Sequence, residues 1–315
     1  MKNLIQFKKY VVLFTFLFNV FSYANETSVK LALNWKPEPE FGGFYEAAPF
    51  YKKAGYNVEI IEGGSATPTA QLLINEKVEF AILSAEEILL NNDRDPQRKL
   101  IAVFSVFEKS PYMIMSHENQ NYKTLSDLFK DKEAIISLQK GLPYVDYLIH
   151  KFTPIQAKLV PYTGGVGLFE KNEKMAQQGF ITSEYLIAQN LKIKSKAWLV
   201  ADEGFNPYIA TLAVREKYLK KNPELVKKVV EATREGWLQY LKSPQTTNRL
   251  MNQKNPSMSF EMMNLSLKKM KDFMVFAPLQ LGQMNKERWN TLGSQLVDLK
   301  LIKQNPQFGE YFQNF

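Results

Sequence analysis

The chain has 315 residues, of which 45% are apolar and 23% charged, and its formal net charge is +8. A chain of this length and apolar content buries one large or two ordinary domain cores, which excludes a mostly disordered protein. It has no cysteine and only two histidines, His117 and His150. Disulfide scaffolds, cysteine-ligated metal centres and thiol nucleophiles are therefore excluded, and a histidine-rich metal site or a Ser-His-Asp hydrolase is disfavoured.

Residues 1–24 have the pattern of a secretory signal peptide. A start with three lysines and no acid precedes a 12-residue apolar run, residues 10–21, and small residues follow at Ser22 and Ala24. A helix of that length spans about 18 Å, whereas the hydrocarbon core of a bilayer is about 30 Å thick, so a cleaved signal is favoured over a membrane anchor. We expect export to the periplasm and a soluble mature chain.

Removal of this segment leaves 37 Lys and Arg against 32 Asp and Glu, a net charge of +5. The remaining cations are spread along predicted helices, as at Lys220-Lys221 and Lys268-Lys269. This spacing is typical of a solvated helix face rather than a nucleic-acid patch. We expect no nucleic-acid partner.

Short β-like runs alternate with helical stretches from residue 29 onward. The first set has expected strands at 29–33, 56–62, 80–83, 101–107 and 112–116, and expected helices at 43–54, 67–75 and 85–91. The second set has expected strands at 134–138, 158–161, 179–181 and 198–201, and expected helices at 125–130, 143–151, 170–177 and 184–189. Such alternation predicts βαβ units and mainly parallel sheets.

After residues 208–214 the pattern becomes helical to the end of the chain. Asn222-Pro223-Glu224 predicts a helix start, because Pro suits the first helical position and an acid suits the positive end of the helix dipole. Further helices are expected at 259–276 and 286–301. The chain is expected to leave the first lobe near 113–116 and to return near 208–211. The predicted lobes are residues 25–114 with 210–315, and residues 115–209.

Two α/β lobes without a flexible linker predict a bilobal molecule with a cleft, and ligands of open parallel sheets gather at the carboxyl ends of the strands. These ends are rich in Gly, hydroxyl, carboxylate and aromatic groups, which suits a small polar ring compound. Trp35 stands out, because an exposed Trp on a Pro-rich loop is costly unless something covers it. A ring stacked on it would gain about 0.5–1.5 kcal/mol beyond burial. The alternative is that Trp35 packs on the prolines of its own loop.

The segment from residue 33 to residue 47 resembles the opening pattern of the ABC-transporter substrate-binding proteins that include thiamine-pyrimidine and sulfonate binders. The matching residues are Leu33, Trp35, Pro37, Gly43, Tyr45 and Ala47. Residues 76–81 resemble that family's Gly-Lys-Val-Asp-Phe-Gly segment, and residues 208–223 resemble its return crossing. The resemblance runs from about residue 29 to the C-terminal helices.

This resemblance implies a bilobal, type II periplasmic-binding fold. It implies a monomer that closes on a small molecule and presents it to an ABC permease in the inner membrane. Thiamine pyrimidine precursors are the favoured ligands, and sulfonates, nitrate-like anions and riboflavin-like rings are the alternatives.

Both lobes are then expected to contact the ligand. The resemblance and the positions of the predicted strand ends together give the expected ligand-binding residues. They are Asn34, Trp35, Phe41, Gly43, Ser65, Ser84, Ala85, Tyr144, Gly164, Gly165, Thr182, Ser183 and Glu184. Thiamine-precursor binders often carry Asp and His in place of Asn34 and Phe41, which leaves a different ring or head group open. The helix start at residues 141–144 offers backbone N–H groups to an anion, or is an ordinary helix start. Glu184 accepts a hydrogen bond from an amino-pyrimidine, or is a helix-start acid.

Fungal-type pyrimidine synthases are similar to the chain through the Lys-Val-Glu segment and are the enzymatic alternative. They place a cofactor-holding Lys and a ring-donating His shortly after that segment. Aligned on Lys77-Val78-Glu79, those positions are Leu83 and Glu87, which can neither form a Schiff base with pyridoxal phosphate nor donate an imidazole. Those enzymes also carry a Cys-rich segment. We therefore expect a non-catalytic binder with no cofactor and no metal.

Overall fold

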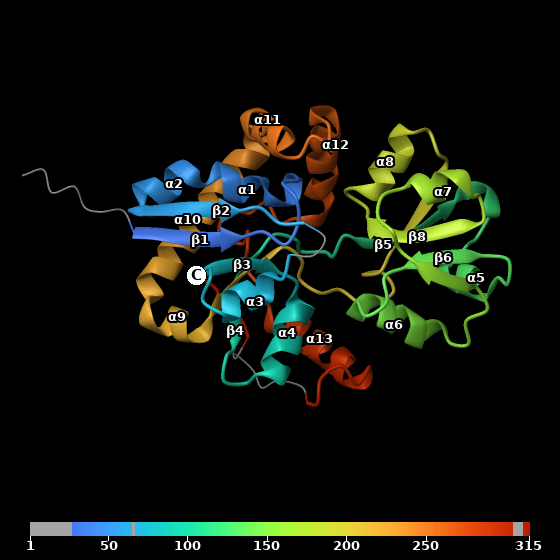
Figure 1. Ribbon diagram of the computed structural model, residues 1–315, viewed down its shortest axis with the longest axis horizontal. Coiled ribbons are helices and arrows are strands. Elements are labelled where there is room, and N and C mark those ends of the chain that lie inside the picture. Colours follow the sequence, from blue (N-terminus) through green and yellow to red (C-terminus); the bar gives the residue numbers. More distant parts are fainter. Residues whose placement is uncertain (1–26, 65–66, 305–310) are drawn as a thin grey trace, which may run out of the picture.

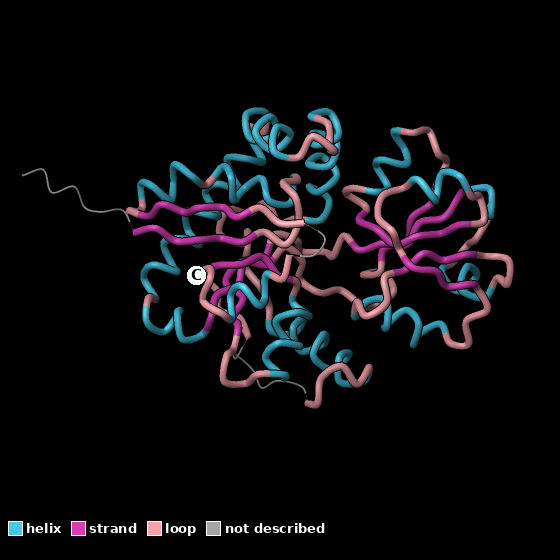
Figure 2. The backbone as a smooth tube through the Cα atoms, viewed as in Figure 1, coloured by secondary structure: helices cyan, strands magenta, loops and turns pink. Residues whose placement is uncertain are grey.

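The computed structural model describes residues 27–64, 67–304 and 311–315. The predicted signal peptide and Ser65 lie outside the described residues. Within the described ranges, no helix has both the length and the apolar character needed to cross a bilayer. Two α/β bodies lie side by side in Figure 1, and the strands in Figure 2 form two separate groups.

The first sheet has the strand order β2-β1-β3-β10-β4. Its strands are β1 (Thr27–Ala32), β2 (Tyr56–Ile61), β3 (Phe80–Leu83), β4 (Leu100–Ser105) and β10 (Thr211–Arg215). All run parallel except β10, which is antiparallel to both of its neighbours. The flanking helices are α1 (Gly42–Glu46), α2 (Ala48–Lys53), α3 (Thr69–Ile74), α4 (Ala85–Arg94), α9 (Glu216–Lys221), α10 (Pro223–Lys242), α11 (Gln245–Lys254), α12 (Phe260–Met270) and α13 (Lys286–Asp298).

The second sheet repeats this plan with the order β7-β6-β8-β5-β9. Its strands are β5 (Tyr112–His117), β6 (Ile135–Leu138), β7 (Lys158–Pro161), β8 (Met175–Phe180) and β9 (Ser195–Leu199). Here β5 is the antiparallel strand. Its helices are α5 (Leu125–Lys130), α6 (Pro143–Phe152), α7 (Gly167–Lys171) and α8 (Glu184–Asn190). The predicted bilobal α/β class with mainly parallel sheets is confirmed.

The predicted helix at 170–177 is wrong over most of its length, because α7 ends at Lys171 and β8 begins at Met175 in the centre of the second sheet. The predicted strand at 179–181 meets only the end of β8. Met, Ala and Gln are good helix formers, which explains the error. In the sheet, both glutamines are buried but satisfied. Gln177 Nε2 donates to the Gly165 carbonyl at 2.9 Å, and Gln178 Oε1 accepts from the Gln139 N–H at 2.6 Å. Tertiary contacts therefore override the local helix propensity.

Helix α1, which follows the loop that carries Trp35, packs closely against α10. The predicted start of α10 is confirmed at Pro223. Gly43 lies so close to this helix that an added Cβ would fall 2.1 Å from Trp237 Cδ2, and one added to Gly236 would fall 2.5 Å from Ala47 Cβ. The glycines therefore let α1 and α10 touch, so the position of Gly43 is explained by packing.

Two chain segments connect the sheets: residues 106–111 before β5, and residues 200–210 before β10. The expected first crossing at 113–116 is wrong, because all of β5 pairs within the second sheet. The proposed lobe boundary after residue 114 thus cuts β5. The division into residues 25–114 with 210–315 and residues 115–209 otherwise stays a prediction.

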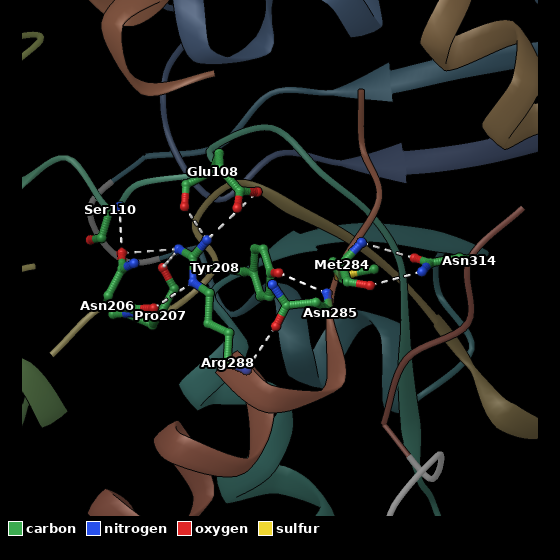
Figure 3. A network of polar contacts seen from close by, with 9 residues as sticks. All are labelled: Glu108, Ser110, Asn206, Pro207, Tyr208, Met284, Asn285, Arg288 and Asn314. Carbon is green, nitrogen blue, oxygen red and sulfur yellow. Dashed lines mark hydrogen bonds and ion pairs between the residues drawn. The ribbon is translucent and has the colours of Figure 1, made fainter. Parts of the chain in front are cut away.

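Arg288, on α13, joins the two crossings to each other (Figure 3). It donates to the carbonyls of Asn206 and Pro207 in the second crossing, each at 2.6 Å. It also donates to the carbonyl of Glu108 in the first crossing. The guanidinium carbon lies 3.8 Å from the centre of the Tyr208 ring, and the side chain is 10% exposed. One arginine therefore fixes both connections to the same helix.

Candidate functional site

A cavity of about 220 Å³ lies between the two sheets. Its first wall comes from the loop after β1, the short 3-10 helix Pro39–Phe41 and the end of the second crossing. Its other wall comes from β5, β8 and the starts of α6 and α8. Ligand pockets usually measure about 300–1,000 Å³, so this cavity suits a compact ligand.

Six of the expected ligand-binding residues line this cavity, and both lobes contribute. They are Asn34, Trp35, Phe41, Tyr144, Ser183 and Glu184. Gly165 instead lines a second hollow of about 460 Å³, which shares Trp35, Glu38, Ser183 and Glu184 with the cavity. The second hollow is thus an outer chamber that adjoins the cavity.

Five other expected residues lie elsewhere in the described structure. Gly43 packs against Trp237, and Ser84 caps α4 by accepting from the Glu87 N–H. Ala85 is buried, and its N–H donates to the Tyr208 carbonyl at 2.9 Å. Thr182 is buried, and Gly164 is exposed in the turn after β7, but neither lines the cavity.

Trp35 is 39% exposed and faces both hollows. Its indole N–H donates to Glu38 Oε1 at 3.1 Å, which orients the ring. Gly63 allows this loop to close on β2, because an added Cβ would fall 2.1 Å from the Leu33 carbonyl oxygen. The Gly63 N–H donates to the Trp35 carbonyl at 3.1 Å. Trp35 is therefore held in place yet keeps an open face.

Aromatic rings form the opposite wall. Tyr112 and Tyr144 stack with centroids 4.2 Å apart at 22°, and Phe180 meets Tyr112 edge-on at 5.3 Å. The Tyr112 hydroxyl donates to Glu86 Oε1 at 3.3 Å, which links β5 to α4 of the first sheet. Tyr112 and Phe180 were not predicted as site residues, because both stand in predicted strands. A strand-end position at an expected crossing is the signal that could have found Tyr112.

Three carboxyl groups, Glu38, Glu40 and Glu184, also line the cavity. Glu184 Oε1 accepts from the Tyr162 hydroxyl at 3.0 Å, and Oε2 accepts from the Phe180 N–H at 2.7 Å. Glu184 thus begins α8 but bonds groups outside that helix. Glu38 and Glu40 were not predicted, although both stand in the Pro-rich loop that contains Trp35.

Burial shifts two of these acids, Glu38 and Glu40, toward their neutral forms. Desolvation raises the pKa of Glu40 to about 7, and the charge of Glu184 adds to this effect. Desolvation also raises the pKa of Glu38, with further contributions from Glu40 and Glu184, while the Trp35 hydrogen bond opposes the rise. The cavity therefore holds one acid, Glu40, whose pKa lies near neutral pH, and a second, Glu38, whose pKa is raised.

Two further features mark the cavity wall. Asn34 Oδ1 is buried and has no hydrogen-bond partner within the described part of the chain. Ala210 adopts the left-handed region at φ 52°, which is uncommon outside glycine and tends to occur at functional sites. An orphaned buried acceptor is unfavourable unless a ligand or water donates to it. Asn34 therefore points to a ligand with a hydrogen-bond donor.

The positions aligned with the synthase residues do not reach this cavity. Leu83 is fully buried in β3. Glu87 accepts from the Ser84 N–H at 2.8 Å as part of the α4 capping box. Among the described residues, no set of three His, Asp or Glu side chains could hold a metal ion.

The solved structures that superpose on the chain include binding proteins and an enzyme. The periplasmic aliphatic sulphonate binding protein SsuA from Escherichia coli superposes with a TM-score of 0.67 at 12% identity, over 88% of this chain and 89% of that chain. A Candida albicans protein described as having the generic periplasmic binding protein fold gives 0.58 at 16% identity, over 87% and 89%. The desulfurization enzyme DSZB gives 0.59 at 12% identity, over 88% and 94%.

These superpositions confirm the predicted periplasmic-binding fold, and because an enzyme shares it, the fold alone does not decide the activity. A search of curated protein sequences found no match. The family model described as NMT1/THI5 like matches residues 38–247, about two thirds of the chain. The chain therefore belongs to the NMT1/THI5-like family.

Proposed function

We propose that the protein is the solute-binding component of an ABC importer and that it holds a small planar ligand between its lobes without altering it. The observation that supports this most is the cavity, in which Trp35 from one lobe and the Tyr112–Tyr144 stack from the other meet. Aromatic walls with a few convergent polar groups are typical of small-molecule sites. These aromatic residues supply binding surface for a ligand from both lobes.

The polar groups favour a ring that donates hydrogen bonds. Asn34 Oδ1 is unpartnered in the described structure, and the three glutamates are acceptors when ionised. A thiamine pyrimidine precursor, with its exocyclic amine, fits this pattern. A sulfonate offers only acceptors and would face carboxylates, although the E. coli structural relative is named as a sulphonate binder.

Closure of the lobes would couple binding to transport. A ligand that shifts the open and closed forms from 1:99 to 99:1 must bind the closed form more tightly by about 5.5 kcal/mol. Contacts from both lobes can supply such a preference. In this proposal the mature protein is a periplasmic monomer that delivers its ligand to an inner-membrane permease.

A thermal-shift screen of aminopyrimidines, alkanesulfonates and flavins tests the proposal. A ligand at 100 times its Kd adds about 2.7 kcal/mol, and each kcal/mol raises the Tm by roughly 2–4 °C. We expect an aminopyrimidine to raise the Tm, and Trp35→Ala to reduce that rise to about half or less. Trp198→Ala is the matched control, because Trp198 lies on β9 outside the cavity.

Two results would contradict the proposal. The first is that Trp35→Ala and Trp198→Ala respond alike, which would place binding elsewhere. The second is a Schiff-base absorbance band with pyridoxal phosphate, which would support the synthase alternative.

A further inference from the structure

The charge of the cavity is one-sided. Glu38, Glu40 and Glu184 line it, whereas no Lys, Arg or His among the described residues does. None of these three glutamates forms an ion pair within the described part of the chain. Lys36 is the cation that lies nearest in sequence, but it lines the outer chamber and is exposed.

Neutral donors only partly satisfy these acids. Glu184 accepts from a tyrosine hydroxyl and a backbone N–H, and Glu38 accepts from the Trp35 indole. A buried carboxylate without a positive partner is unfavourable, and the group responds by keeping its proton. This explains why Glu40, which is 7% exposed, has a pKa of about 7.

The Glu184 carboxylate packs closely against the strand β8. Gly179, on β8, faces this side chain, and an added Cβ would fall 2.8 Å from Glu184 Oε2. The strand thus leaves room for the carboxylate beside the cavity. The aromatic rings Trp35, Tyr112 and Tyr144 surround the same space, and such rings attract a cation over their faces.

We propose that the cavity selects a positively charged ligand, a planar heterocycle that carries a protonated amine. This inference rests on the proposed function and names the charge of its ligand. The groups that face Glu40 are Glu38 beside it, Glu184 from α8 and Tyr240 from α10, with Lys36 beside Glu38. Apart from Lys36, each is an acid or a phenol.

Proton displacement sets the direction of the pH dependence. At a pH below about 7, Glu40 is mostly protonated, so a cation must expel a proton to bind beside its carboxylate. The affinity for a cation therefore falls as the pH falls, by up to tenfold per pH unit for one displaced proton. The affinity for a neutral ring changes little.

Calorimetric titration of the mature chain with three compounds on one 2-aminopyrimidine ring, whose ring nitrogens stay unprotonated across the pH range used, tests this. A methylene on the ring carries an ammonium, a hydroxyl or a sulfonate group. At pH 7.5 we expect the ammonium compound to bind at least tenfold more tightly than the hydroxyl compound, and the sulfonate to bind most weakly. Between pH 7.5 and 5.5, only the ammonium compound loses affinity.

Variants assign the effect to the cavity. Glu40→Gln should remove most of the ammonium preference and its pH dependence. Glu46→Gln, which makes the same charge change on α1 outside the cavity, should retain both. If Glu40→Gln fails to fold by circular dichroism, the pH series on the unchanged chain decides.

Equal or tighter binding of the hydroxyl or sulfonate compound would overturn the charge inference and leave solute binding intact. Failure of all three compounds to bind would overturn the proposed ligand class, and the inference with it.

Discussion

Replacement of Arg288 by Gln should loosen the connection between the lobes. The guanidinium donates to three backbone carbonyls on the two crossings, and its side chain is 10% exposed, so water can replace only some of these bonds. A hydrogen bond to a charged group contributes about 1.5–3 kcal/mol, and stranded buried carbonyls cost about 1–3 kcal/mol each, without simple additivity. We expect Arg288→Gln to destabilise the fold by about 3 kcal/mol, which lowers the Tm by roughly 6–12 °C.

A measurement of the interlobe distance shows whether Arg288 holds the two lobes in a fixed relative position or only stabilises the fold. The chain has no cysteine, so spin labels on Lys171→Cys in α7 and Lys227→Cys in α10 report the distance between lobes by pulsed electron paramagnetic resonance. Arg288→Gln should broaden the distance distribution.

Arg215→Gln is the matched control. Arg215 is 12% exposed and donates to the carbonyls of Leu73 and Val78 at 2.6 and 2.7 Å, but it lies within the first lobe. The Arg215→Gln variant should be less stable than the unchanged chain but should have the same interlobe distance distribution. If Arg288→Gln behaves in the same way, the hinge reasoning is refuted.

Three other substitutions give separate tests. Trp35→Ala should weaken ligand binding at least tenfold with little change in Tm, because the ring is 39% exposed; an equal loss of stability would make it structural. Gly179→Ala should displace the Glu184 carboxylate and weaken binding in calorimetry, whereas Gly167→Ala, where an added Cβ meets nothing within 4 Å, should not. Burial raises the pKa of Glu86 to about 8, so the free energy of unfolding should fall as the pH rises from about 5 to 8. Glu86→Gln should flatten that dependence in urea titrations, and an unchanged slope would contradict the assignment.

The lobes were predictable where local signals agree with tertiary contacts. The run Phe80–Leu83 is apolar throughout and is a fully buried central strand, and Thr124 with Asp127 forms the capping box that starts α5. The first part of β8, Met175–Gln178, was not predictable in this way. Gln177 and Gln178 are stable in a sheet centre only because distant backbone groups bond them.

The site residues also fall into two groups, those that local sequence signals indicate and those whose role depends on tertiary contacts. Trp35 and Glu184 could be expected from strand ends that carry polar or aromatic groups. Glu40 could not, because its raised pKa depends on burial between the lobes and on the charge of Glu184 from the opposite lobe. Gly43 illustrates the reverse error: it belongs to a family-like motif, yet its lack of a side chain serves the contact with Trp237.

The spin-label pair on α7 and α10 also tests the central claim, that the two lobes close on a small guest. With the ammonium-bearing aminopyrimidine at saturation, the interlobe distance should shorten and its distribution should narrow, and the compound should be recovered chemically unchanged. A distribution that stays the same at saturation would contradict closure between the lobes.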